Sequence, residues 1–145
     1  MSEATETAER FLDRTVTDIS TLADLYAEHA VIEMPFASPL FPTRREVTRD
    51  ELRAGFTRAG GPRYTGTSDI RIHETADPNT AVLEYRLHGV VTAHEGQQEF
   101  ALDYIMVITT QNGLIVRSRD YSSLFQAAQA MGLTERLIAA LNSTD

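Results

Sequence analysis

The sequence predicts an α+β fold in which helices cover one face of an antiparallel sheet. Three segments before residue 60 place apolar side chains at helical spacing, whereas residues 67–122 alternate with period two and are rich in β-branched side chains. Asn112-Gly113 is the strongest hairpin signal between the strands. Helices that come first and strands that follow in one run favour this class, and the sheet is expected to curl around the helices.

Three helices are expected before the main run of strands. Residues 8–15 repeat apolar side chains at helical spacing, and Asp18 can cap a second helix over residues 19–26. The third helix begins at the capping box Thr48-Arg-Asp-Glu51, whose Thr and Glu side chains satisfy backbone N–H groups of the first turn. Gly60-Gly61-Pro62 ends this helix, because glycine and proline interrupt helical backbone.

Five strands are expected, and a loop separates the first from the others. Residues 30–36 form the first strand, which Pro35 ends because proline has no N–H to donate to a neighbouring strand. The later strands cover residues 67–74, 80–91, 97–110 and 114–122. The turns between them lie at residues 77–79, 94–96 and 112–113. A tail of one or two amphipathic helices follows, over residues 124–131 and 134–141, with Gly132 as a helix stop.

Length and charge limit the classes of function. The chain has 145 residues, of which 42% are hydrophobic, so one domain over residues 1–145 with a single core is expected. With 13 basic and 21 acidic residues, its net charge of −8 repels nucleic-acid phosphates and anionic lipids. The chain has no cysteine, no metal-site histidine spacing and no phosphate-binding motif, so no metal or cofactor is expected. Its acidic amino terminus and lack of a long apolar run predict a cytoplasmic protein without membrane contact.

A carboxylate, Asp120, interrupts the last strand where the alternation points toward the core. In the stretch GLIVRSRDYSS the even positions Val116, Ser118 and Asp120 share one face. One interpretation is a desolvated carboxylate with a raised pKa, which suits proton transfer. The other is a strand-end carboxylate paired at the surface with Arg117 or Arg119. Periodicity alone leaves both interpretations open.

Polar side chains on the two preceding strands are expected to face the same cavity. Asp103 belongs to the odd set of its strand, and Arg86 and His88 belong to the even set of theirs. With the last-strand carboxylate they form a candidate catalytic group of acids, bases and hydrogen-bond donors. If the register is shifted by one residue, Tyr85 and Leu87 face inward instead, and Arg86 forms a solvent-exposed ion pair.

The strand over residues 97–110 has one uniformly apolar face. If the mixed face lines the cavity, the apolar face lies on the outside, and an exposed apolar patch of that size is typical of a partner surface. The sequence therefore predicts a homodimer through the outer sheet face. The residues expected there are Phe100, Leu102, Tyr104, Met106 and Ile108.

Four segments of the chain, AERFLD, DLYAEHAVIEMPF, LDYIMV and GLIVRSRDYSS, are similar to a known superfamily. This is the nuclear-transport-factor-2-like (NTF2-like) superfamily of ketosteroid isomerases, limonene epoxide hydrolases, SnoaL-like polyketide cyclases and phenazine-biosynthesis isomerase-like proteins. EMPFASP and RDYSSLFQAAQAMG make the SnoaL-like branch the most similar. The resemblance implies a cone-like fold, in which a strongly curved antiparallel or mixed sheet wraps around three N-terminal helices and a helical tail follows.

The resemblance also implies roles for individual residues. Arg119-Asp120-Tyr121 matches the R-[DE]-Y motif in which epoxide hydrolases and SnoaL-like cyclases carry a catalytic Asp. Asp103 falls where the isomerases have a protonated Asp that donates to an oxyanion. Met34, however, replaces the isomerase base, and Phe11 replaces the oxyanion tyrosine. Arg86-Leu87-His88 has His where the hydrolases have the Asp of an Arg-x-Asp pair, so both of those reactions are disfavoured.

These observations favour a cofactor-independent enzyme of isomerase or polyketide-cyclase type that acts on a hydrophobic carbonyl compound. Asp120 is expected to abstract a proton next to the carbonyl, and Asp103, with Arg86 or His88, to stabilise the enolate. Two alternatives remain, a non-catalytic domain for ligand binding or dimerisation and an epoxide hydrolase. The residues expected to line the substrate pocket are Phe11, Met34, Phe36, Val116 and Ser118.

Overall fold

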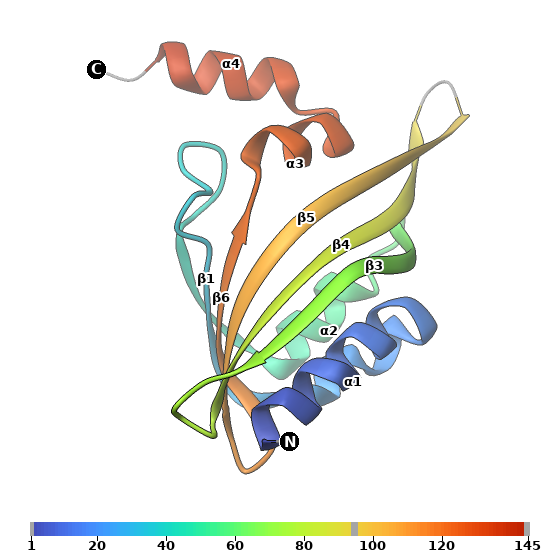
Figure 1. Cartoon of the computed structure of the whole chain (residues 1–145). Coiled ribbons are helices and arrows are strands. Elements are labelled where there is room, and N and C mark those ends of the chain that lie inside the picture. The colour runs from blue at the N-terminus through green and yellow to red at the C-terminus, as the bar shows by residue number, and fades with distance from the viewer. Residues whose placement is uncertain (1, 94–95, 144–145) are drawn as a thin grey trace.

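The computed structural model describes residues 2–93 and 96–143, and the expected turn at His94-Glu95 lies outside these residues (Figure 1). Helix α1 (Glu3–Thr17) begins where the Ser2 hydroxyl accepts a hydrogen bond from the backbone N–H of Thr5. The second helical segment, η1 (Ile19–Leu25), is a 3₁₀-helix and therefore tighter than the α-helix that the sequence pattern predicts. Tyr26, expected at the end of that helix, instead begins the first strand.

The capping box predicted for the third helix is present. In α2 (Arg49–Phe56) the Thr48 hydroxyl accepts from the backbone N–H of Glu51, and the Glu51 carboxylate accepts from the backbone N–H of Thr48. This reciprocal pair fixes the start of the helix directly after a strand. The helix ends before the Gly60-Gly61 pair, and its buried residue Leu52 packs in the core.

The sheet has six strands within the described residues, one more than expected, in the order β2-β1-β6-β5-β4-β3. The additional strand, β2, pairs with β1 and lies in the segment expected to be a loop. β1 and β6 run parallel, and the other pairs are antiparallel, so the sheet is mixed. The strands are β1 (Tyr26–Glu33), β2 (Arg44–Thr48), β3 (Arg63–Glu74), β4 (Thr80–Ala93), β5 (Gly96–Gln111) and β6 (Leu114–Ser122).

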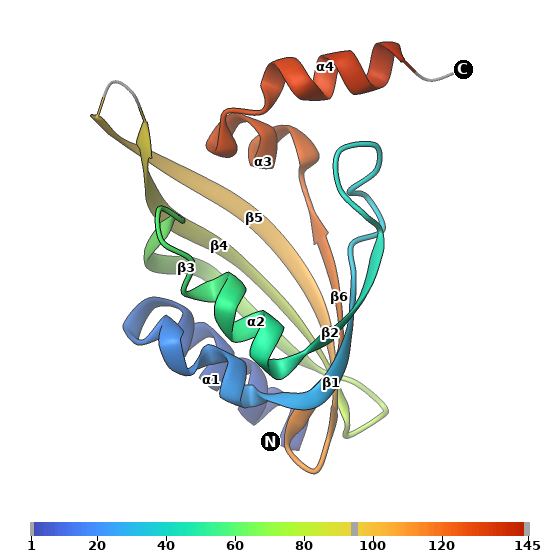
Figure 2. The ribbon, with the colours of Figure 1, turned by 180° about the vertical axis from the view of Figure 1, so that it is seen from behind.

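The sheet curves around α1 and α2, which both lie on its inner face (Figures 1 and 2). The C-terminal helices α3 (Leu124–Met131) and α4 (Thr134–Asn142) lie at the end of the sheet opposite the N-terminus. Gly132 adopts the left-handed conformation that the stop between them requires. This arrangement confirms the cone-like NTF2 fold predicted from the sequence.

The apolar face of β5 points inward, so the prediction that it lies outside is wrong. Register pairs Leu83 of β4 with Met106, and both side chains belong to the core beneath the helices. The physical reason is that the largest apolar set gains most from leaving water. Of the five residues predicted on an outer dimer surface, Leu102, Met106 and Ile108 are buried, and Phe100 and Tyr104 are partly buried.

No helix in the described parts of the chain has the length and apolar character needed to cross a membrane.

Candidate active site

Asp120 lies on the inner face of the sheet, as one of the two interpretations of the sequence predicts. β6 pairs Asp120 with Met106 and Ser118 with Ile108, and both partners on β5 are core residues. Ser118 is fully buried, and its hydroxyl donates a hydrogen bond to the Asp120 carboxylate. Asp120 itself is partly buried. The strand thus places a carboxylate with a fixed orientation among apolar side chains.

This environment moves the pKa of Asp120 toward neutrality. Burial disfavours the charged form and raises the pKa to about 6, while the hydrogen bond from Ser118 and the charge of Arg45 act in the opposite direction. A carboxyl group with a pKa near 6 both accepts and returns a proton close to neutral pH. Asp120 therefore has the acid–base properties of a proton-transfer group.

Three buried or partly buried tyrosines, from three different strands, lie within electrostatic reach of this carboxylate. Tyr26 on β1, Tyr85 on β4 and Tyr104 on β5 each have a raised pKa, first because they are buried and also because the negative charge of Asp120 is nearby. The phenols stay protonated at neutral pH and can donate hydrogen bonds. The cluster of Tyr26, Tyr85 and Tyr104 is called the phenol cluster below.

The phenol cluster has unused donor capacity. The rings of Tyr85 and Tyr104 stack with their centroids 5.4 Å apart, and the Tyr85 hydroxyl donates to the Met106 Sδ at 3.3 Å, a weak acceptor. In the described part of the chain, no hydrogen bond engages the phenolic oxygen of Tyr26 or Tyr104. Donors of this kind, next to a carboxylate, can bind a ligand oxygen on which negative charge develops.

Sequence reasoning missed the phenol cluster, although the alternative with a shifted register placed one of its members, Tyr85, inward. Tyr85 faces inward because the register differs by one residue from the preferred assignment, as the shifted alternative predicted. Tyr104 belongs to the apolar set that was placed outside. A buried tyrosine among leucines looks like an ordinary core residue in a sequence, so the three phenols carried no separate signal.

The predicted wall residues divide between the two faces. Phe11 belongs to the same apolar cluster as the phenol cluster, and Met34 packs against that cluster. Phe36 is 63% exposed and contacts the ring of Tyr121, which β5–β6 pairing places opposite Ile105 on the outer face. The prediction that Phe36 lines the inner pocket is therefore not supported by its position.

A β-bulge displaces Val116 from the position that alternation gave it. Thr109 pairs with Arg117, and the next residue, Thr110, pairs with Ile115, which leaves Val116 as the extra residue. Ile115 takes the fully buried place instead. Strict alternation from Ser118 back to Val116 fails because the bulge adds one residue to β6.

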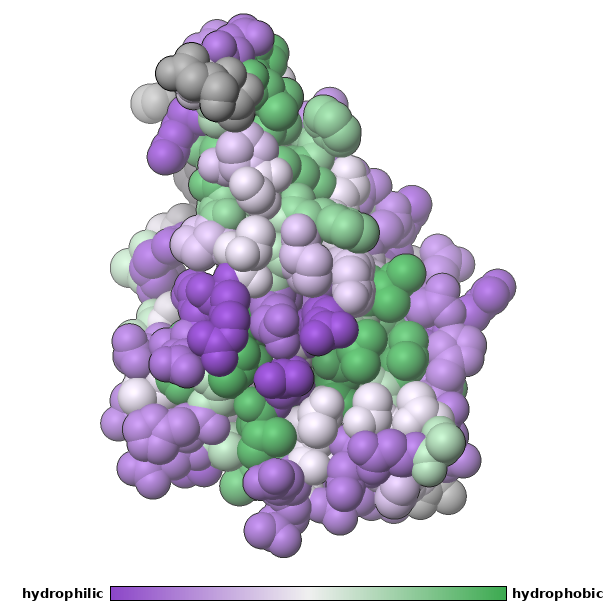
Figure 3. All heavy atoms as spheres, turned by 90° about the vertical axis from the view of Figure 1, so that its left-hand side faces the viewer, coloured by the Kyte–Doolittle hydropathy of each residue, from purple (hydrophilic) through white to green (hydrophobic). Residues whose placement is uncertain are grey.

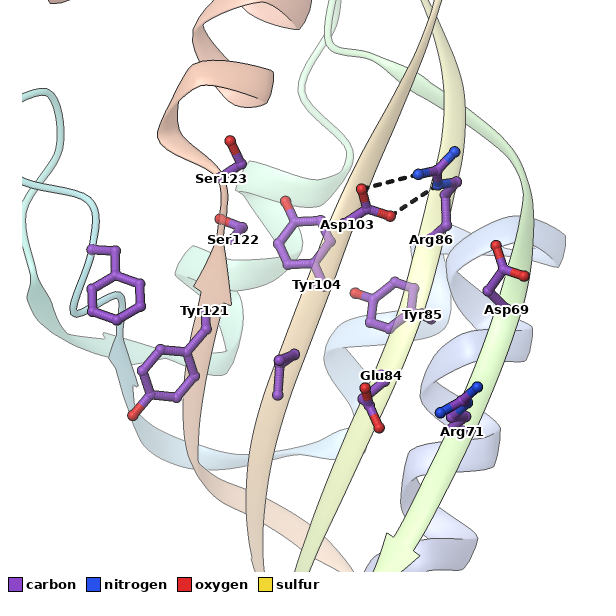
Figure 4. Close-up of a pocket in the computed structure, with 12 residues that line it drawn as sticks. Asp69, Arg71, Glu84, Tyr85, Arg86, Asp103, Tyr104, Tyr121, Ser122 and Ser123 are labelled. Atoms are coloured by element: carbon purple, nitrogen blue, oxygen red, sulfur yellow. Dashed lines mark hydrogen bonds and ion pairs between the residues drawn. The ribbon is translucent and has the colours of Figure 1, made fainter.

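Arg86, Asp103 and His88 lie on the outer face, so their predicted convergence with Asp120 is wrong. The guanidinium of Arg86 donates to both carboxylate oxygens of Asp103, at 2.8 and 3.1 Å, and both side chains are exposed (Figure 4). This bidentate pair lowers the pKa of Asp103. His88 hydrogen-bonds to Ser68 at 2.7 Å. The cause is again the register, because these residues alternate with Tyr85 and Tyr104.

A shallow pocket of about 550 Å³ lies on the outer face (Figure 4). Its charged residues include Glu84, Arg86 and Asp103, and its apolar residues include Ile105 and Tyr121. Tyr85 and Tyr104 border it as well, although their rings stack in the inner cluster.

A space-filling view of the side where β1 and β6 lie shows hydrophilic residues gathered between hydrophobic areas (Figure 3). Within residues 2–93 and 96–143, no group of three or more His, Asp or Glu side chains is arranged to hold a metal ion.

Comparison with known proteins places this site in a family. Residues 8–118 match the SnoaL-like domain family. An uncharacterized PhzA/B-like protein of Pseudomonas aeruginosa is 35% identical over 115 residues, which are 77% of this chain and 77% of that protein.

Solved structures share the fold of this chain. The crystal structure of a candidate isomerase from Bacillus subtilis matches with a TM-score of 0.74 and 28% identity. The match covers 91% of this chain and 94% of the isomerase chain. A candidate polyketide cyclase from Pseudomonas putida matches with a TM-score of 0.71 and 20% identity. That match covers 90% of this chain and 98% of the cyclase chain. The chain therefore belongs to the SnoaL-like domain family within the NTF2-like superfamily.

Proposed function

We propose that this protein is a cofactor-independent enzyme of isomerase or cyclase type that moves a proton next to a carbonyl group. The observation that supports this most strongly is Asp120, an inward carboxylate with a pKa of about 6 beside three protonated phenols. The names of two similar proteins, a candidate isomerase and a candidate polyketide cyclase, point to the same kind of chemistry. The apolar residues around the site favour a hydrophobic ligand.

In the proposed reaction, the Asp120 carboxylate takes a proton from the carbon next to the carbonyl. The electron pair of that C–H bond forms the carbon–carbon double bond of an enolate, and the carbonyl π electrons move to its oxygen. A phenol of the phenol cluster, Tyr104 or Tyr26, donates a hydrogen bond to this oxygen, because neither phenol is engaged within the described residues. In a substrate with a carbon–carbon double bond next to this carbon, the enolate is a dienolate. Asp120 then returns the proton to the far (γ) carbon of that dienolate, the double bond moves into conjugation with the re-formed carbonyl, and the isomerisation is complete.

The test uses hydrogen exchange with solvent, because it requires no knowledge of the natural substrate. Cyclic ketones such as 2-tetralone are incubated with the protein in D₂O, and deuterium incorporation next to the carbonyl is followed by NMR. Asp120→Asn should lower the enzyme-dependent exchange rate by about 100-fold. Asp103→Asn, which removes a carboxylate from the outer face, is the matched control and should leave the rate unchanged.

Exchange that persists in Asp120→Asn would overturn this assignment. Binding of the ketones without any enzyme-dependent exchange would favour the non-catalytic alternative, a small-ligand-binding domain. That alternative draws on Met34 and Phe11, which stand where the ketosteroid isomerases carry their base and oxyanion tyrosine.

Epoxide hydrolysis ranks below both. Arg86 and His88 occupy the positions of the hydrolase pair, and both side chains lie on the face opposite Asp120. They are therefore too poorly placed to help Asp120 activate a water molecule.

Two copies of the chain are also proposed to associate through the outer sheet face, with different residues from those the sequence suggested. Ile105 is 44% exposed and pairs with Tyr121 across β5 and β6. The ring of Tyr121 in turn contacts the ring of the exposed Phe36. An exposed apolar group with charged residues at its border resembles a protein interface, in which an apolar centre has a polar rim.

A further inference from the structure

Arg45 lies on the same face of the sheet as Asp120. β1 pairs Ile32 with Arg45 on one side and with Ser118 on the other, so the three residues form one row across three strands. Directly opposite residues in paired strands point to the same face. Val47, two residues further along β2, is buried in the core, which confirms that this set faces inward. β2 is an edge strand, and Arg45 is exposed there.

Among the residues that the structure describes, the guanidinium of Arg45 has no hydrogen-bond or ion-pair partner, whereas those of its neighbours do. Arg44 pairs with Glu46 at 3.3 Å, Arg49 donates to the backbone oxygen of Tyr26, and Arg53 pairs with Asp24 at 2.7 Å. Arg45 makes no hydrogen bond or ion pair within the described residues. Its charge nevertheless acts on two carboxylates. Hydrogen bonds with Thr48 and, less strongly, the charge of Arg45 lower the pKa of Glu51 on α2. The charge of Arg45 also opposes the rise that burial causes in the pKa of Asp120. An arginine without a hydrogen-bond or ion-pair partner among the described residues therefore stands at the border of a site in which the Asp120 carboxylate lies among apolar and phenolic side chains.

We propose that Arg45 selects substrates that carry a carboxylate in addition to the reacting carbonyl. A guanidinium presents parallel N–H donors that fit a carboxylate with two hydrogen bonds. Because Asp120 is itself anionic when it acts as a base, an acidic substrate needs a cation to offset the repulsion. Arg45 supplies that charge at the edge of the sheet, while the reacting carbonyl reaches the phenol cluster. The inference rests on the proposed function, since it concerns the same site.

A matched pair of probes tests this inference by binding alone. 6-Acetyl-2-naphthoate and 2-acetylnaphthalene share the ring system and the ketone and differ in the carboxylate. Isothermal titration calorimetry should show the wild-type protein binding the naphthoate about tenfold more tightly than the neutral ketone. Arg45→Gln should remove this preference and leave the affinity for the neutral ketone unchanged. Arg44→Gln, a charge loss next in sequence on the opposite face, should keep the preference.

Equal loss in Arg44→Gln and Arg45→Gln would overturn the inference, because it would indicate a general effect of net charge. A wild-type protein without preference for the naphthoate would overturn it too. The exchange experiment tests the proposed function independently of this inference. If Asp120→Asn keeps full exchange while Arg45→Gln loses the preference, the acid–base assignment is wrong and the arginine site stands. If Asp120 is required for exchange and Arg45→Gln binds both probes like the wild type, only the arginine inference is wrong.

Discussion

Ser118 and Asp120 lie two residues apart on β6, so the pleat of the strand places both on the inner face. The sequence suggested Ser118 as a substrate-binding residue. Its hydroxyl instead donates to the Asp120 carboxylate, and its side chain is fully buried. Ser118 is therefore better described as a positioning residue, which orients the carboxylate and holds its pKa below the value that burial alone would give.

The raised pKa of Asp120 predicts that ionising this residue destabilises the fold. The carboxyl group holds its proton more tightly in the folded state, with a pKa of about 6, than at its ordinary value of 3.8 in the unfolded chain. Its contribution favours folding fully below about pH 4 and is lost as the pH rises through 6. Asp120→Asn keeps the shape without the charge, so it should be more stable than the wild type at pH 7, by up to roughly 3 kcal/mol. Urea unfolding between pH 4 and pH 7 measures the difference, which should shrink toward pH 4.

Asp103→Asn is the control for that measurement, and its effect on the free energy of unfolding at pH 7 should have the opposite sign to that of Asp120→Asn. The ion pair with Arg86 lowers the pKa of Asp103, so its charged form stabilises the fold, and this contribution is lost as the pH falls. The variant should be slightly less stable than the wild type at pH 7 and approach it in acid. A loss of stability at pH 7 in Asp120→Asn would contradict the assignment of a destabilising buried charge.

At the scale of elements, Gly89 and Phe100 lie opposite each other in β4 and β5. A Cβ added at Gly89 would lie 2.6 Å from Cζ of Phe100 and 2.9 Å from the backbone oxygen of Arg63. Gly89→Ala should therefore destabilise the protein by about 1–3 kcal/mol, because the ring and the neighbouring strand must both move. Thermal unfolding measures the loss. Gly66→Ala, on β3 with no atom within 4 Å of the added carbon, should change stability far less, and equal effects would refute this steric account.

Helix and strand positions were largely predictable, because local chemistry determines them. The capping box at Thr48, the turn at Asn112-Gly113 and the stop at Gly132 each act within a few residues, and all three are present. β2 was missed because its five residues are mostly charged and lack an apolar alternation. The bulge at Val116 was missed because it depends on the partner strand. Long-range pairing adds information that a local pattern does not contain.

At the scale of the whole molecule, the sheet faces were not determined by alternation. Alternation separates two sets of residues on β4 and β5, but it does not say which set the helices cover. The burial of apolar surface decides, and it places the large residues Leu83, Leu87 and Met106 beneath α1 and α2. Asp120 was identifiable because it is a charged exception in its set. Arg86 and Asp103 were misplaced because a charged pair on an exposed face has the same residue types as an active site.

The corrected faces give a last prediction, about the assembly of two chains. With the β5 apolar set inside, Ile105 is an exposed apolar residue on the outer face, two residues along β5 from Asp103 of the Arg86–Asp103 pair. Light scattering after size-exclusion chromatography should give the mass of two chains for the wild type. Ile105→Asp should give the mass of one chain, because a dimer would bury the new charge without a partner.

Ala54→Asp is the control for the assembly prediction, since it introduces the same charge at an exposed position of α2, on the far side of the sheet. It should leave the mass at two chains. If Ile105→Asp remains a dimer, association uses another surface, and the exposed side chains of α3 and α4, among them Phe125 and Ile138, become the place to look. A wild type of single-chain mass would refute association altogether. In a monomer, the outer pocket beside Ile105 would be open to solvent. Its charged residues, among them Glu84, Arg86 and Asp103, would then stay hydrated, because no second chain would cover them.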